Sequence, residues 1–120
     1  MNVSWVKCGT SGNWCSLETL NLDSVGEVGG VYVVWHEGSL YQPSRTVKVG
    51  QGEPIKGRLS AHRNDREILA YRKFGTLRVT WAAITLAERN GVERYLGDTL
   101  HPLVGSLFPN AIPIAVNHPW

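Results

Sequence analysis

The sequence has no long apolar run, and this absence limits the kinds of protein it can encode. A helix that spans a bilayer needs about 20 mostly apolar residues, whereas polar residues, Gly or Pro interrupt every apolar stretch of this 120-residue chain. The amino terminus also lacks the basic and then apolar order of a secretory signal. We therefore expect a soluble, cytoplasmic protein without membrane contact.

Cysteine is scarce, and the usual nucleotide-binding glycine motifs are missing. Cys8 and Cys15 lack the closely spaced pairs of a structural zinc site, and without a secretion signal we expect them to be reduced thiols. The chain has no Gly-Lys-Ser/Thr element, and Gly50, Gly52 and Gly57 do not have dinucleotide-binding spacing. An NTPase or a Rossmann domain is therefore disfavoured.

A chain of 120 residues is most simply one compact domain with one core. Residues 1–29 are rich in Gly, Ser and Asn, and we expect an irregular arm whose Trp5 and Trp14 pack on the core. Residues 30–110 carry the periodic segments, and residues 111–120 form a carboxy-terminal extension. There is no internal repeat.

Positive charge concentrates in one part of the chain. The net charge is only +2, but residues 1–44 carry −3, residues 45–78 carry +6, and the remainder carries −1. A phosphate backbone is the partner that such a basic segment attracts, since cation contacts release counterions. The alternative is an ordinary solvated basic surface.

Alternating side chains predict three strands, over residues 31–36, 46–49 and 77–81. If they pair, one face buries Val, Leu and Trp, and the other presents Tyr32, Lys48 and Arg78.

Pro54 begins a predicted helix that places Arg58 and His62 on one face. The Asn64 to Glu67 box predicts a helix through Phe74, and the Asn90 to Glu93 box opens another. Residues 109–120 form a closing strand or an extended tail. The expected fold is α+β, with a small, three-stranded, mostly antiparallel sheet flanked by helices.

The order of these motifs resembles the GIY-YIG nuclease superfamily. Gly30-Val31-Tyr32 opens the first strand, Lys48-Val49-Gly50 closes the second, and Arg58 and His62 follow one helical turn apart. The resemblance covers most of residues 29–110. Lys48 stands where the family usually has its second Tyr, as in some restriction enzymes of the family.

The resemblance implies a divalent-metal-dependent endonuclease, a hydrolase that cleaves phosphodiester bonds. Phosphodiester hydrolysis requires water activation, stabilisation of phosphate charge and neutralisation of the leaving oxygen. Tyr32 would position or deprotonate the water with help from Lys48, Arg58 would stabilise the phosphate, and Glu93 would bind one Mg²⁺ or Mn²⁺. His62 matches an additional His of some members. The substrate would be a nucleic acid, most simply DNA, and its predicted contacts are Lys56, Arg63, Arg66, Arg72, Lys73 and, as the family's late Asn, Asn110.

Each site residue also has an ordinary structural explanation. Tyr32 is typical of a strand, Lys48 of a solvent-facing strand position, and Arg58 with His62 of an exposed helix face. Glu93 follows Asn90 by three residues, so it would serve a helix N-cap equally well. Two other functions therefore stay open. One is a non-catalytic nucleic-acid-binding module with a degenerate site, and the other is a protein-interaction domain that uses the Trp-rich arm.

Overall fold

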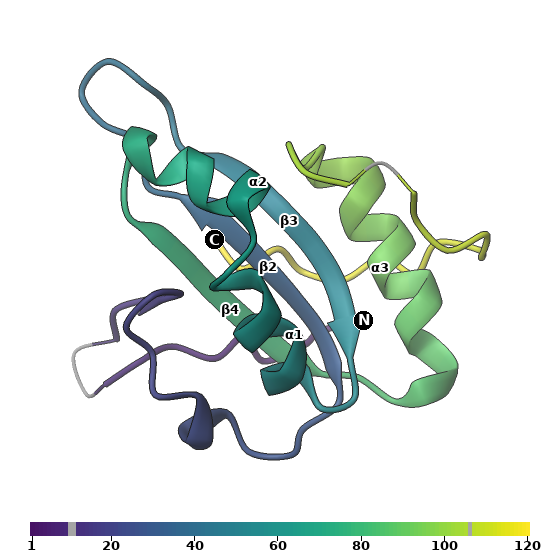
Figure 1. Ribbon diagram of the computed structural model, residues 1–120. Helices are drawn as coiled ribbons and strands as arrows, with labels where there is room; N and C mark the ends of the chain where they lie inside the picture. The colour runs from purple at the N-terminus through teal and green to yellow at the C-terminus, as the bar shows by residue number, and fades with distance from the viewer. Residues whose placement is uncertain (10–11, 106) are drawn as a thin grey trace.

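The computed structural model describes residues 1–9, 12–105 and 107–120, and it has an α+β fold. The strands are β1 (Cys15–Ser16), β2 (Gly30–His36), β3 (Arg45–Gly52) and β4 (Leu77–Ala83). The helices are α1 (Ile55–His62), α2 (Arg66–Leu69) and α3 (Leu86–Leu100), with 3₁₀ helices η1 (Leu22–Val25) and η2 (Ala70–Phe74). In Figure 1, α1 and α2 lie in front of the sheet, and α3 lies alongside β3. None of the described helices is long and apolar enough to cross a bilayer.

The sheet has four strands rather than the expected three, in the order β1-β4-β2-β3, and every neighbouring pair is antiparallel. The additional strand comes from the amino-terminal arm, where Cys15 pairs with Val79 and Ser16 with Arg78. Two residues are too few to show an alternating pattern, so periodicity could not predict β1. The arm is otherwise irregular, as predicted.

The expected division of side chains between the two faces was wrong for Arg78. Tyr32 pairs with Trp81, and Trp35 pairs with Arg78. Because directly paired residues point to the same face, Trp81 shares the face of Tyr32, and Arg78 lies on the opposite face. There Arg78 donates hydrogen bonds to Glu37 and to the carbonyl of Trp14.

Both faces of the sheet are covered, so every residue of β2 is buried. The face covered by α1 and α2, called the α1 face below, holds Tyr32, Leu59 and Ile68 in its core. The face packed by α3, called the α3 face, holds Val33, Trp35, Val92 and Leu96, together with Val116 of the tail. A β-bulge between Val34 and Trp35 shifts the β3 register, so Val47 joins the first core and Val49 the second.

The helix boundaries differ from the sequence expectations at three places. Asp65, rather than Asn64, caps α2 by accepting from the backbone N–H of Glu67, and the segment continues as 3₁₀ helix to Phe74. Pro54 precedes α1 with an extended conformation. α3 begins four residues before Asn90, after Thr85, whose hydroxyl donates to Glu88. Thr85 is therefore the N-cap residue, although its side chain bonds the Glu88 carboxylate and makes no hydrogen bond to the backbone of the first turn.

The chain termini pack on the α3 face as extended segments. Trp14 meets Trp35 edge to face at 5.4 Å, and Trp120 lies 4.8 Å from Trp35 between ring centroids. Trp5 donates its indole N–H to the carbonyl of Asn117. Of the two predicted alternatives for residues 109–120, a closing strand or an extended tail, the structure has the extended tail. Cys8 and Cys15 form a disulfide, so the prediction of free thiols was wrong. An isolated β-bridge between Cys8 and Asn13 turns the chain back on itself, and the Cα atoms of the two cysteines are 4.9 Å apart.

Candidate active site

The fold brings Tyr32, Lys48, Arg58, His62 and Glu93 into one cluster at the β3 edge of the sheet, where the first four lie on the α1 face and Glu93 comes from α3. β2 contributes Tyr32, β3 contributes Lys48, α1 contributes Arg58 and His62, and α3 contributes Glu93. The Tyr32 hydroxyl lies 2.5 Å from Nε2 of His62. Lys48 and Arg58 act electrostatically on both His62 and Glu93. Residues that span more than 60 positions of sequence therefore share one electrostatic environment.

Two glycines of β3 make room for this cluster. Gly50 is the direct partner of Tyr32, and a Cβ atom on Gly50 would come within 2.3 Å of the Tyr32 hydroxyl. A Cβ atom on Gly52 would come within 2.8 Å of Cγ of Arg58. The Tyr32 ring and the stem of Arg58 thus lie directly against the β3 backbone. The space beside Gly50 and Gly52 is therefore filled by these two side chains.

Burial sets the protonation states of the Tyr32–His62 pair. Desolvation raises the pKa of Tyr32 far above its ordinary value, with Arg58 opposing the shift and Glu93 adding to it. Desolvation and then the charge of Lys48 lower the pKa of His62 to about 4, against a smaller opposing effect of Asp65. At neutral pH a protonated phenol therefore donates its hydrogen bond to a neutral imidazole, whose own proton is on Nδ1.

Glu93 lies in the interior of α3, half-buried, and it does not cap the helix. The pKa of Glu93 is raised, because the effect of burial exceeds the opposing effects of a hydrogen bond from Gln51 and of the charges of Lys48 and Arg58. Gln51 also donates from Nε2 to Oδ1 of Asn90 at 2.7 Å. Gln51 therefore links Asn90 to Glu93, a contact that sequence reasoning missed. The available signal was the three-residue spacing of Asn90 and Glu93, which puts both on one side of a helix.

Glu93 is the one carboxylate of the five cluster residues that could bind a divalent cation. Among residues 1–9, 12–105 and 107–120, no group of three or more His, Cys, Asp or Glu side chains is placed to hold a metal ion. Mg²⁺ commonly binds through one or two carboxylates and completes its shell with water and substrate phosphate. Glu93 fits that arrangement and does not fit a site made of protein ligands alone.

The predicted nucleic-acid contacts divide into two groups in the structure. Lys56 pairs with Glu27 at 2.5 Å, Arg72 pairs with Glu18 at 3.2 Å, and Arg63 donates to the carbonyls of Leu17 and Leu20. These three side chains thus bind other parts of the protein. In contrast, Arg66 and Lys73 are exposed and line a surface depression on α2 and η2, together with Leu69, Ala70 and Arg72.

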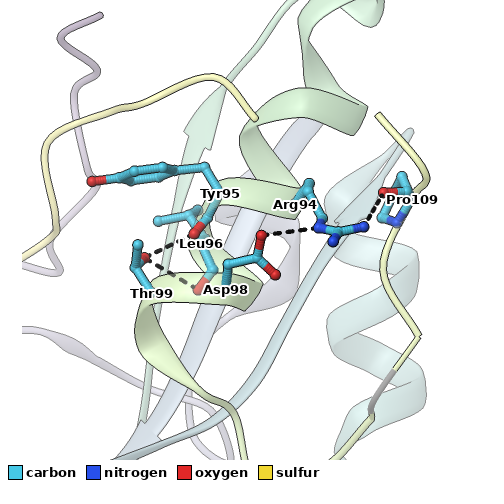
Figure 2. Close-up of polar contacts among 6 residues, drawn as sticks. All are labelled: Arg94, Tyr95, Leu96, Asp98, Thr99 and Pro109. Carbon is cyan, nitrogen blue, oxygen red and sulfur yellow. Dashed lines mark hydrogen bonds and ion pairs between the residues drawn. The ribbon is translucent and has the colours of Figure 1, made fainter. Parts of the chain in front are cut away.

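Asn110 lies apart from the cluster in the carboxy-terminal tail. The preceding residue, Pro109, accepts a hydrogen bond from Arg94, which also binds Asp98 on α3 (Figure 2). Asn110 is exposed, and none of the side-chain hydrogen bonds found among the described residues joins it to the five cluster residues. Asn90 is the asparagine that reaches the cluster, through Gln51.

Comparisons with known proteins leave the cluster as the main guide to function. No protein-family model, curated protein sequence or solved structure matches this chain.

Proposed function

We propose that this protein is a cytoplasmic, divalent-metal-dependent endonuclease of the GIY-YIG type that hydrolyses phosphodiester bonds in nucleic acid, most simply DNA. The observation that carries the proposal is the convergence of Tyr32, Lys48, Arg58, His62 and Glu93 from four elements onto one site. Perturbed pKa values that arise from burial and specific charges are common at catalytic sites. Bringing five ionisable groups together in a partly buried site costs free energy, so stability alone does not explain this arrangement.

Water activation falls to the Tyr32–His62 pair. As water attacks phosphorus, the water proton passes to the Tyr32 oxygen while the phenol proton moves to Nε2 of His62, 2.5 Å away. The low pKa of His62 makes it a weak base in the free protein. The negative phosphodiester raises that pKa when it enters, because an opposite charge favours the imidazolium. Substrate binding thereby prepares the proton acceptor.

Phosphate charge is stabilised by Arg58 and Lys48. Arg58 is exposed at its head and is held by its stem against Gly52, so its guanidinium is free to contact a phosphate oxygen. Lys48 lies near both His62 and Glu93 and supplies a second positive charge where negative charge develops. Glu93 would hold the divalent cation, which supplies Lewis-acid stabilisation of the leaving oxygen.

The alternative is a nucleic-acid-binding module without turnover. The observation in its favour is that burial raises the pKa of Glu93 and thereby disfavours the carboxylate that binds a metal, while Lys48 and Arg58 lie close enough to compete with a metal for that carboxylate. Such a module would bind DNA in a salt-dependent manner and would show no cleavage with any divalent ion.

Cleavage of supercoiled plasmid and of single-stranded DNA, with Mg²⁺ or Mn²⁺, tests the proposal. We expect Arg58→Ala and Glu93→Ala each to slow cleavage by about 100-fold or more, the range seen when one charge-stabilising group is removed. Arg94→Ala is the matched control, because Arg94 neighbours Glu93 but binds Asp98 and Pro109. Equal activity in all four proteins would point to a contaminating nuclease. Binding without cleavage by the wild type would favour the alternative.

Tyr32→Phe tests the proton path within the same assay. The substitution removes the hydroxyl that contacts His62 and keeps the buried ring. Loss of general acid–base catalysis costs about 100- to 10,000-fold in rate. Unchanged cleavage by Tyr32→Phe would assign water activation to Lys48 instead.

A further inference from the structure

A second hollow lies next to the proposed site, between η2 and the segment that follows α3. Its walls are Tyr71 and Phe74 on one side and Leu103 and Val104 on the other, with Glu67, Ala70 and Lys73 at the rim. Its volume is about 420 Å³, within the range of about 300–1,000 Å³ that is typical of small-molecule sites. Apolar walls with a few charged groups are also typical of such sites.

One wall of the hollow is hydrogen-bonded to β3 just before Lys48. Leu103 and Val104 donate backbone hydrogen bonds to the carbonyls of Thr46 and Val47, the two residues before Lys48. A Cβ atom on Gly105 would come within 2.7 Å of Nζ of Lys48. The hollow therefore begins about 7 Å or less along the strand from Lys48, which is comparable with one nucleotide step of an extended strand.

The aromatic wall is held in a fixed orientation. Phe74 lies 5.6 Å from the buried His36 ring and 6.2 Å from the Tyr71 ring between centroids. Lys73 places its ammonium 5.2 Å from the Phe74 ring centroid. An aromatic wall beside a basic groove is how proteins bind the bases of a single strand, because each base has a stacking face and each linkage a negative charge.

We infer that this hollow binds one unstacked base of a single-stranded or locally opened nucleic acid, next to the phosphodiester held at the catalytic cluster. The inference rests on the proposed function for its placement of that phosphodiester. The base stacks on Phe74 or Tyr71, Lys73 contacts the backbone, and Glu67 accepts from an exocyclic amino group of the base. A base paired within a duplex cannot enter, so the preferred substrate is single-stranded or unpaired at this position.

Binding without divalent metal tests the inference separately from catalysis. Fluorescence anisotropy would compare labelled oligo(dC), an abasic oligonucleotide of equal length and a duplex. We expect the abasic strand to bind about tenfold more weakly than oligo(dC), because it lacks the base that stacks in the hollow. Equal affinity for the two single strands, or no affinity for oligo(dC), would overturn the inference.

Ala70→Trp fills the hollow without removing a core side chain, because Ala70 is an exposed rim residue. We expect it to reduce oligo(dC) affinity to the abasic level and to leave duplex affinity unchanged. Ala87→Trp is the control, since Ala87 is exposed on α3. If both variants bind oligo(dC) like wild type, the hollow is not a base site. If Ala70→Trp does not fold, the comparison of oligo(dC) with the abasic strand in wild type still decides.

The two proposals fail in different ways. Base-dependent binding by a protein that never cleaves DNA would refute the nuclease and retain the base site. Cleavage that depends on Arg58 and Glu93, together with equal affinity for base-bearing and abasic strands, would refute the base site and retain the nuclease.

Discussion

The two faces of the sheet are built from the same strands, yet they differ in chemistry. On the α3 face, Val33, Val49 and Leu96 pack with other apolar side chains. On the α1 face, the adjacent residue Tyr32 is equally buried, but its hydroxyl meets His62 beside two cations and a carboxylate. Groups that lose hydration cost free energy unless they are paired. The α1 face therefore combines its own apolar core with paired ionisable groups, whereas the α3 face around Leu96 is apolar.

The largest effect expected from this comparison is a loss of stability on the α3 face without a loss of chemistry. Leu96 is fully buried there, and Leu→Ala at such positions costs about 2–5 kcal/mol of unfolding free energy. We expect Leu96→Ala to show that loss in urea denaturation. Cleavage per folded molecule at low temperature should stay within about threefold of wild type, a margin worth less than 1 kcal/mol. A loss of activity as large as that of Glu93→Ala would show that the two faces are not separable.

A single methyl group on the α1 face should affect both stability and chemistry. Gly50→Ala forces a Cβ atom against the Tyr32 ring, and overpacking of this kind costs about 1–3 kcal/mol. The displaced phenol also loses its contact with His62, so we expect cleavage to fall with stability. Gly57→Ala is the control, because a Cβ there meets nothing within 4 Å. Because Gly57 lies within the α1 helix, Gly57→Ala should raise the free energy of unfolding by about 0.5–1 kcal/mol. Thermal melts and cleavage rates check both variants.

A smaller effect concerns pH and the Tyr32–His62 pair. His62 has a folded-state pKa of about 4, below its ordinary value of 6.5. The unfolded chain therefore binds the proton first as pH falls. The resulting stability is fully present above the ordinary value and is lost as pH falls toward about 4. We expect wild type to lose about 1 kcal/mol more than His62→Gln between these limits, after allowance for solvent screening of this half-buried ring.

The measurement is urea denaturation of both proteins at several pH values, with His101→Gln as the control at an exposed position outside the cluster. Parallel stability profiles for wild type and His62→Gln would show that His62 titrates normally in the folded protein. In that case the proton acceptor of the proposed mechanism would be charged at mildly acidic pH.

The smallest expected effect separates exposed cations on the α1 face from those already paired. Arg66 lies at the surface of α2, whereas Lys56 forms an ion pair with Glu27. We expect Arg66→Gln to weaken DNA binding about threefold and to reduce the salt slope by about 1, as loss of one phosphate contact does. Lys56→Gln should change binding less. Anisotropy titrations at several salt concentrations would measure both, and equal losses would mean that DNA displaces Glu27.

The sequence alone determined the local elements and the residues that reach the site. The alternation of β2 and the Arg58–His62 spacing on α1 are local properties that a short segment expresses wherever it lies. The alternation expected in β3 was wrong, because the β-bulge puts Val47 and Val49 on different faces. The α+β fold, the three main strands and the irregular arm were predictable on this basis. The enzymatic role that we assign to these residues stays a prediction.

Only the tertiary structure decided which residues share a face and which ones meet. Strand pairing put Arg78 on the face of the sheet away from Tyr32, and the early start of α3 excluded the helix cap that was the alternative to a site role for Glu93. The arm added β1 and a disulfide, and the tail took Asn110 away while Asn90 approached through Gln51. These outcomes depend on register and on contacts between distant segments. Periodicity within one segment predicts neither the register nor these contacts, because it indicates which way a side chain points and not which residue lies opposite it.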